Sequence, residues 1–196
     1  MKDQPLDITS FLKLVLEALH ASRVEYMIGG AVAEWAWGEP RATQDLDIVI
    51  NLPIKAVSRF SKELENRNML VPADIILDTL MENRADIPLN AIHIYSGLKA
   101  DLYLMREGDA LRKSAFQRRL LVDYGPPIGE VYIHSPEGLI LYKLMYLGLS
   151  GQPKHARDIA AILKAKKDQL DFGYIERWVD QLGLGSLWKE ILDNIV

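Results

Sequence analysis

The segment from Asp45 to Ile50 places two acidic residues in an otherwise aliphatic stretch, Asp-Leu-Asp-Ile-Val-Ile. Side chains alternate between the two faces of a strand, so Asp45 and Asp47 point to the same face. Aspartate is a poor strand former, and two neighbouring carboxylates repel each other. A divalent cation would hold both carboxylates together, and Mg²⁺ favours carboxylates combined with phosphate and water oxygens. The pattern predicts a metal-binding strand; the alternative is an exposed strand end.

A third acid occurs in a later apolar stretch, Ala100-Asp101-Leu102-Tyr103-Leu104. If this stretch forms a strand beside the first, Asp101 lies on the same face as Asp45 and Asp47. Three carboxylates can hold two metal ions, which activate an attacking oxygen and stabilise a leaving pyrophosphate.

Two glycines, Gly29 and Gly30, stand where the expected strand 24–28 meets the expected helix 31–37. Glycines at such a junction let a phosphate approach the backbone, and the free amides of a helix start attract anions. A simple tight turn would also use two glycines, so the pair gains meaning only from the acidic strand that follows it.

The pattern of the chain changes near residue 135. Before it we expect strands at 24–28, 45–50, 91–95, 99–105 and 131–134, and helices at 8–21, 31–37, 54–66 and 73–83. After it we expect only helices, at 136–149, 154–167, 173–182 and 186–195. Asp7 or Thr9 would cap the first helix. We therefore predict an α/β fold: a mixed sheet flanked by helices in residues 1–134, and a helical part in 135–196 that completes a cleft.

The 196 residues carry a net charge of −4 and include no cysteine, which excludes disulfides, thiolate metal sites and cysteine nucleophiles. No stretch approaches the roughly 18 consecutive apolar residues of a membrane span, and the N-terminal segment lacks the features of a signal peptide. We expect a cytoplasmic protein with no membrane partner. Two stretches, 106–119 and 154–167, are locally basic and form either a basic surface or solvated helix faces.

Lys143 is the single charge in the otherwise apolar stretch 138–148, which follows a strong helix start at Ser135-Pro136-Glu137. A helix that is apolar on nearly every side is buried, and a buried lysine needs an anion. If its ammonium is unpaired in the free protein, replacement by methionine should leave the melting temperature unchanged or raised. The alternative is a lysine whose ammonium reaches the surface.

The hydrophobic-Gly-Gly turn, the Asp-Leu-Asp strand and the distant Asp101 resemble the nucleotidyltransferase superfamily of DNA polymerase beta. With Arg41 and Thr43 before the acids, the sequence looks most similar to bacterial AbiEii-like and MenT-like nucleotidyltransferases, which include toxin components. The resemblance covers residues 24 to 165. It implies the minimal nucleotidyltransferase core, and no resemblance explains the last helices, beyond Asp171.

The resemblance also implies roles for individual residues. Gly29 and Gly30 would hold a nucleoside triphosphate such as ATP. Asp45, Asp47 and Asp101 would ligate two Mg²⁺ ions, with Mn²⁺ as a substitute, and Asp101 would also act as the base for the acceptor hydroxyl. Arg41 would lie near the phosphates or shape its loop, and Thr43 would assist or only start the strand.

In the helical half, the resemblance places Lys143 toward the nucleotide phosphates and matches an Arg-Asp pair of the next helix with Arg157 and Asp158. Asp158 would pair with Lys143 or with Arg157; the alternative is an ordinary surface pair. His93, His134 and His155 lie at unrelated spacings, so we predict no histidine metal site.

These features predict transfer of a nucleoside monophosphate from an NTP to a hydroxyl or phosphate acceptor, with release of pyrophosphate. As in toxin-like relatives, the acceptor would be tRNA and an antitoxin would be a partner protein. A tRNA acceptor is favoured if the two basic stretches form one surface beside the cleft. The alternatives are a small-molecule, antibiotic-type adenylyltransferase with a hydroxylated acceptor, and a non-catalytic NTP-binding regulatory partner. A glycosidase also uses paired acids but leaves Gly29, Gly30 and Lys143 unexplained.

Overall fold

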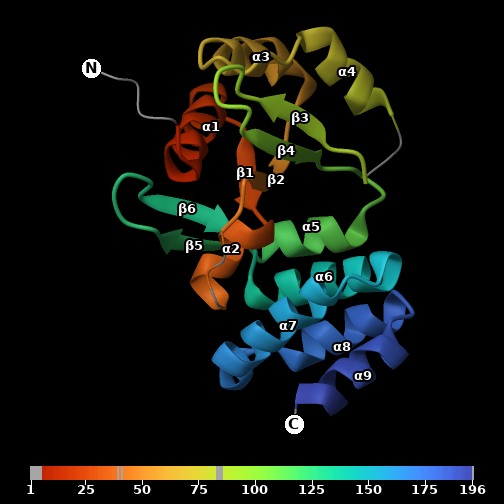
Figure 1. The fold of residues 1–196 in the computed structure, drawn as a ribbon. Helices are drawn as coiled ribbons and strands as arrows, with labels where there is room; N and C mark the ends of the chain where they lie inside the picture. The colour runs from red at the N-terminus through yellow and green to blue at the C-terminus, as the bar shows by residue number, and fades with distance from the viewer. Residues whose placement is uncertain (1–5, 39, 41, 83–85, 196) are drawn as a thin grey trace.

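The computed structural model describes residues 6–38, 40, 42–82 and 86–195 (Figure 1). The first part mixes helices and strands: α1 Ile8–Ser22, β1 Glu25–Ile28, α2 Gly30–Trp37, β2 Asp45–Asn51, η1 Ile54–Ala56, α3 Val57–Glu65, α4 Ala73–Met81, β3 Leu89–Ile92, β4 Lys99–Leu104, α5 Ala110–Gln117, β5 Leu120–Asp123 and β6 Glu130–Ile133. The second part is helical: α6 Pro136–Ser150, α7 Pro153–Lys166, η2 Lys167–Gln169, α8 Phe172–Gln181 and α9 Gly185–Ile195. The predicted α/β fold with a helical C-terminal part is confirmed.

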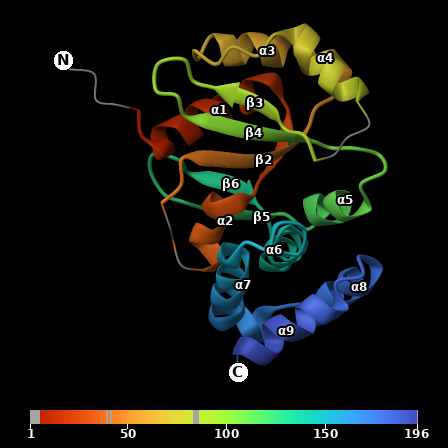
Figure 2. The ribbon, with the colours of Figure 1, turned by 45° about the vertical axis from the view of Figure 1, so that its right-hand side comes forward.

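Six strands form one mixed sheet in the order β3-β4-β2-β1-β6-β5. The strand β2 pairs in parallel with β4 and antiparallel with β1. The strand β1 pairs in parallel with β6, while β3 and β5 pair antiparallel at the two edges. The acidic strand therefore lies inside the sheet, beside the strand that carries Asp101 (Figure 2).

The face of β2 opposite its aspartates belongs to the main hydrophobic core. Leu46, Ile48 and Ile50 are fully buried in one cluster with Phe11 of α1 and Phe60 of α3. The helix α1 begins after Asp7, whose carboxylate accepts a hydrogen bond from the Ser10 amide at 2.7 Å. Asp7 is thus the cap, and not Thr9. Burial of the aliphatic face fixes the register of β2 and turns its carboxylates to the other side.

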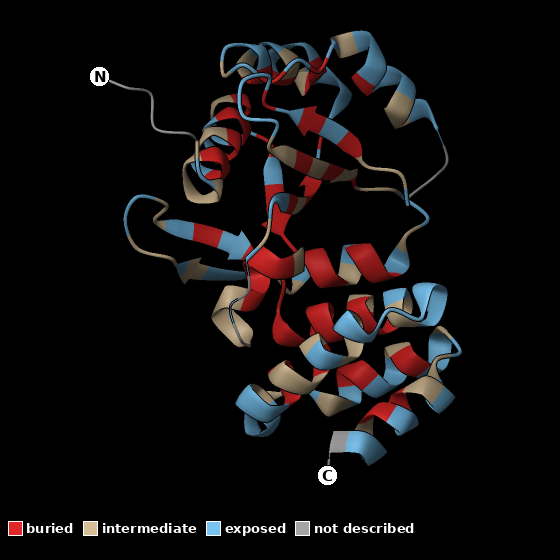
Figure 3. Cartoon of the chain, viewed as in Figure 1, coloured by how far each residue is buried: buried red, intermediate tan, exposed pale blue. Residues whose placement is uncertain are grey.

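The helical part joins the first part through α6 and α7, which both pack against α2. The start of α6 is the predicted one: Ser135 caps the helix, Pro136 follows, and the Gly138 amide donates to the Ser135 hydroxyl at 3.2 Å. The main hydrophobic cluster runs without a break from α1 to residues of α6, α7, α8 and α9 (Figure 3). The division of the chain at residue 134 remains a prediction.

Several elements differ from the sequence predictions. The helix expected at 54–66 begins as the 3-10 turn η1 and becomes α-helical only at Val57. The strand expected at 91–95 spans Leu89–Ile92, because a turn closes at once between the Gly97 amide and the His93 carbonyl, 2.9 Å apart. The sequence analysis did not predict the helix α5. It also did not predict β5, a short edge strand that pairs only with β6. No helix within the described residues is long and apolar enough to cross a membrane.

Candidate active site

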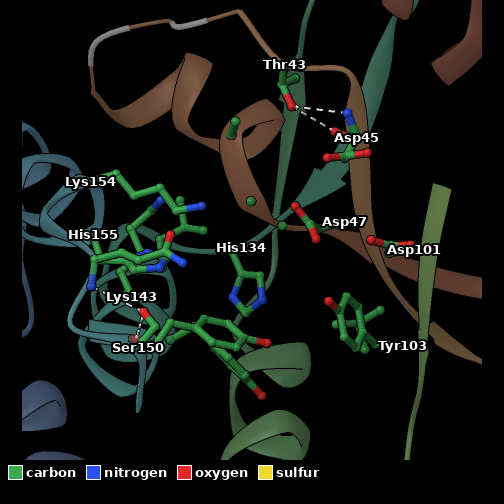
Figure 4. A pocket seen from close by; sticks show the side chains of 18 of the residues that line it. Thr43, Asp45, Asp47, Asp101, Tyr103, His134, Lys143, Ser150, Lys154 and His155 are labelled. Carbon is green, nitrogen blue, oxygen red and sulfur yellow. Dashed lines mark hydrogen bonds between the residues drawn. The ribbon is translucent and has the colours of Figure 1, made fainter. Parts of the chain in front are cut away.

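A cleft of about 400 Å³ opens between the sheet and the helical part (Figure 4). One wall is the glycine turn before α2 together with β2 and β4, and it carries all three predicted acids. The other wall is formed by α6 and the start of α7, with a contribution from α5. The residues that line this cleft therefore come from both halves of the chain.

The pairing of β2 with β4 brings the three aspartates to one face. Asp47 lies directly opposite Asp101 in the parallel register, and Asp45 lies two residues before Asp47 on the same strand. Figure 4 shows Asp47 and Asp101 entering the cleft from neighbouring strands, with Asp45 above them. Asp45 is exposed, whereas Asp47 and Asp101 are half-buried. The predicted shared face is confirmed.

Burial and the two neighbouring carboxylates both act on the charge of Asp47. Burial raises the pKa of Asp47, and the carboxylates of Asp101 and Asp45 raise it further, with partial compensation from Lys143 and Lys99. Asp101 is held from two sides. One carboxylate oxygen accepts a hydrogen bond from the Asn90 amide at 2.7 Å, and the other lies 2.9 Å from the ammonium of Lys99.

The donor set suits a hard cation that also takes oxygens from a ligand. Three carboxylates on one face are the oxygen donors that Mg²⁺ prefers, and this ion is usually bound by one or two carboxylates plus substrate phosphates. Among the described residues, no three acidic or histidine side chains already converge closely enough to hold an ion by themselves. A cation at these acids would therefore be completed by water or phosphate oxygens.

The glycine turn fits closely against Asp47. Gly29 caps α2, and its amide donates to the Asp47 carbonyl at 2.7 Å. Gly30 has a φ of 54°, and a Cβ built there would lie 1.9 Å from a carboxylate oxygen of Asp47. Position 30 thus requires glycine both for its backbone conformation and for the space beside a predicted metal ligand.

Of the two residues predicted from the loop before β2, Arg41 lies outside the described residues. Thr43 lines the cleft, donates through its hydroxyl to the Asp45 carbonyl at 3.0 Å and accepts from the Asp45 amide at 3.3 Å. Thr43 therefore fixes the start of β2 next to the first aspartate.

Lys143 is buried and lines the cleft, so the alternative of an ammonium at the surface is wrong. Its ammonium forms ion pairs with Glu34 of α2 and with Asp158 of α7, the latter at 2.6 Å. Lys143 is therefore paired in the free protein. The anions that a buried lysine needs are two carboxylates of the protein itself. Asp158 pairs with Lys143 as one of the predicted alternatives. Arg157 is exposed and lines a second hollow, of about 390 Å³, together with Glu34 and Asp158.

Sequence patterns did not identify several residues that line the cleft: Tyr103, Arg112, His134, Tyr142, Tyr146, Ser150, Gln152, Lys154 and His155. Tyr103 follows Asp101 by two residues, so strand alternation could have placed it on the same face. Tyr142 and Tyr146 are four residues apart and share a helix face. Arg112 is buried on α5, whose basic residues gave no sign of burial.

His134 lines the cleft, although its spacing from the other histidines suggested no role. Burial, with a smaller contribution from the charge of Arg112, lowers the pKa of His134 to about 3. Its ring packs edge-on against Tyr142, with ring centroids 5.2 Å apart. The imidazole is therefore a neutral part of the cleft at physiological pH.

No protein-family model matches the chain, and no curated protein matches it. Among solved structures, the solution structure of the antibiotic-resistance factor ANT(2'')-Ia matches with a TM-score of 0.61 and 15% identity, over 95% of this chain and 96% of that one. The crystal structure of ANT(2'')-Ia in complex with adenylyl-2''-tobramycin matches with a TM-score of 0.60 and 14% identity, over 92% and 98%. An antigenic nucleotidyltransferase-like protein from Paracoccidioides brasiliensis gives a TM-score of 0.48 and 17% identity, over 81% and 75%.

The two ANT(2'')-Ia structures cover nearly the whole of both chains, including the helical part. At this level of identity the likeness establishes the fold and not the substrate. The chain shares the fold of ANT(2'')-Ia.

Proposed function

We propose that this protein is a magnesium-dependent nucleotidyltransferase that moves a nucleoside monophosphate from an NTP to an acceptor, with ATP as the first candidate donor. The observation that carries the proposal is the meeting of three carboxylates with the glycine turn in one cleft. Asp47 lies opposite Asp101 in the sheet, and its carboxylate occupies the space beside Gly30. The fold that the chain shares with ANT(2'')-Ia supports the same conclusion.

The residues divide into a phosphate side and an acidic side. Gly29 and Gly30 would bind the triphosphate through backbone amides at the start of α2. Asp45, Asp47 and Asp101 would hold two Mg²⁺ ions, or Mn²⁺ in their place. When bound, the ions would neutralise the charge on the transferred phosphoryl group and the leaving pyrophosphate.

Two further residues have proposed roles in the transfer. Asp101 would accept the proton of the attacking hydroxyl; Figure 4 shows it on the far side of Asp47 from Lys143 and Lys154. Lys143 has three ammonium hydrogens, of which the two carboxylates require two, so one remains to meet a phosphate oxygen.

The acceptor is constrained by the charges around the cleft. The carboxylates among its described lining residues are the three predicted metal ligands, whereas Arg112, Lys143 and Lys154 are cationic. An acceptor with several ammonium groups, as in aminoglycoside antibiotics, would find few anions once metal is bound. A neutral hydroxyl compound needs no such anions and is the first candidate. Because Arg112 pairs with Asp109, and Lys143 with Glu34 and Asp158, the antibiotic-type adenylyltransferase stays the alternative.

The basic surface that would favour tRNA is weaker than the sequence suggested. Within residues 106–119, Arg106 donates to the Leu80 carbonyl at 2.7 Å, Arg118 pairs with Asp171 at 3.2 Å, and Arg119 pairs with Glu25 at 3.1 Å. A tRNA acceptor and an antitoxin partner, as in AbiEii-like and MenT-like proteins, stay predictions. A small hydroxylated acceptor needs no such surface.

A non-catalytic NTP-binding protein is the remaining alternative. It is disfavoured because Asp47 is held partly buried beside two further carboxylates, and burial together with these neighbours raises its pKa. Such a cluster destabilises the fold unless a cation is bound, and a protein without catalysis has no use for it.

The proposal is tested by incubating the purified protein with Mg²⁺ and each of four radiolabelled NTPs. The acceptor arms are total tRNA, tobramycin and a panel of neutral sugars and nucleosides. We expect label transfer or pyrophosphate release that requires Mg²⁺ and is lost in Asp47→Asn. If no arm shows either reaction and calorimetry detects no NTP binding, the proposed function is wrong.

A further inference from the structure

Lys99 occupies a position between two of the three acids. Its ammonium lies 2.9 Å from a carboxylate oxygen of Asp101 and 3.8 Å from one of Asp45. The backbone explains this placement, because Lys99 lies directly opposite Asp45 in the β2–β4 register and two residues before Asp101 on its own strand. Strand alternation therefore sends the side chain to the acidic face.

Asp101 has a donor on each of its oxygens. Asn90 lies opposite it on β3 and donates to the first oxygen at 2.7 Å, while Lys99 holds the second. Each oxygen keeps a second lone pair for an ion, but the Lys99 ammonium beside that oxygen would repel the ion, so binding is favoured when this donor moves away. The Lys99 side chain is 35% exposed and has four flexible methylenes, so it can swing toward solvent. Asn90 has a shorter side chain and lies on β3, directly opposite Asp101.

We propose that Lys99 is a tethered cation that fills part of the metal position in the metal-free protein and leaves Asp101 when an ion binds. The proposal rests on the metal site of the proposed function. In the free protein the ammonium reduces repulsion among the acids. In the metal-bound protein the same charge opposes the ion, so Lys99 sets the metal affinity of the site.

The test measures binding of Mn²⁺ alone, without nucleotide, from the paramagnetic resonance signal of the free ion. Lys99→Met removes the charge and keeps the apolar stem, and we expect it to bind Mn²⁺ about three- to tenfold more tightly than the unchanged protein. Lys99→Arg keeps the charge and should bind within about twofold of the unchanged protein. The control Lys13→Met removes an exposed lysine from α1 and changes the net charge equally.

A second measurement separates competition from a purely structural role. In excess chelator, Lys99→Met should melt at a lower temperature than the unchanged protein, because the acids lose their counter-ion. Added Mn²⁺ should raise the melting temperature of Lys99→Met by more than it raises that of the unchanged protein. A structural lysine would lower stability with and without the ion and would not tighten binding.

The outcomes distinguish the two proposals. Equal or weaker Mn²⁺ binding by Lys99→Met, with binding that Asp47→Asn removes, overturns the role of Lys99 and leaves the metal site standing. If Asp47→Asn and Asp45→Asn leave Mn²⁺ binding unchanged, the ion does not bind at these acids, and the proposed function fails together with the inference.

Discussion

Asp47 combines two properties that oppose each other, a place near the centre of the cleft and an unfavourable charge. Its pKa is raised because burial and the two neighbouring aspartates both disfavour the carboxylate. Above the ordinary value of 3.8, the folded protein binds more protons at this group than the unfolded chain does. Stability at this position is therefore lost as the pH rises, and bound metal would restore it.

We predict that Asp47→Asn raises the melting temperature in chelator at pH 7 and lowers label transfer by at least about a hundredfold, because the transition state loses a charge stabiliser. The gain in melting temperature should shrink as the pH falls toward 3.8, where the native carboxylate is protonated. Thermal unfolding from pH 4 to pH 8 checks the sign. A variant with full transfer activity would exclude Asp47 as a metal ligand.

His134 gives the opposite dependence on pH. The unfolded chain takes up a proton near 6.5, whereas the folded protein does so only at about 3. Stability should therefore fall as the pH drops below 6.5, by about 1.4 kcal/mol per pH unit relative to a protein without this imidazole.

The comparison variant is His134→Gln, with the free energy of unfolding measured by denaturant titration between pH 7 and pH 4. The difference between the two proteins should change steadily with pH in this range. If the free energies of unfolding of the two proteins changed in parallel with pH, His134 would take up its proton in the folded protein as it does in the unfolded chain. The imidazole would then be accessible to water.

At the scale of elements, the junction of β1 and α2 is shaped by the aspartate of the neighbouring strand. The amide of Gly29 bonds to the backbone of Asp47, and position 30 has room for no Cβ. The turn and the acidic strand are therefore one structural unit, although 16 residues separate Gly30 from Asp47 in the sequence.

We predict that Gly30→Ala loses about 1 kcal/mol of stability through its left-handed backbone and also displaces the Asp47 carboxylate. Transfer should fall by roughly a hundredfold. Gly97→Ala is the matched control, because Gly97 has a φ of 72° and open space around its Cβ position. The control should show the stability loss alone. Equal activity in both variants would show that the contact with Asp47 has no role in transfer.

At the scale of the whole molecule, a buried charge cluster joins the sheet part to the helical part. Lys143 of α6 contacts Glu34 of α2 and Asp158 of α7, and α2 packs against both helices. Since Glu34 lies one turn after Gly30, the cluster also links the helical part to the phosphate side of the cleft.

We predict that Lys143→Met destabilises the protein by about 3–5 kcal/mol, because the buried Glu34 and the partly buried Asp158 lose the ammonium that they share. This reverses the outcome expected for an unpaired lysine. Lys154→Met, which removes an exposed lysine from the same cleft, should change stability little. The triple variant Lys143→Met, Glu34→Gln, Asp158→Asn should recover most of the loss. Thermal and denaturant unfolding check all three, and an unchanged melting temperature in Lys143→Met would contradict the cluster's role.

The sequence alone determined the acidic strand, the glycine turn and the helix start at Ser135, because each depends on local rules: alternation along a strand, backbone freedom of glycine, and capping. It also placed Asp101 correctly, since strand pairing fixes which side chains share a face. Only the tertiary structure decided the partners of Lys143, the placement of Lys99 between two acids and the burial of Arg112. These depend on which elements meet in space, and neither the charge nor the periodicity of a segment records its neighbours.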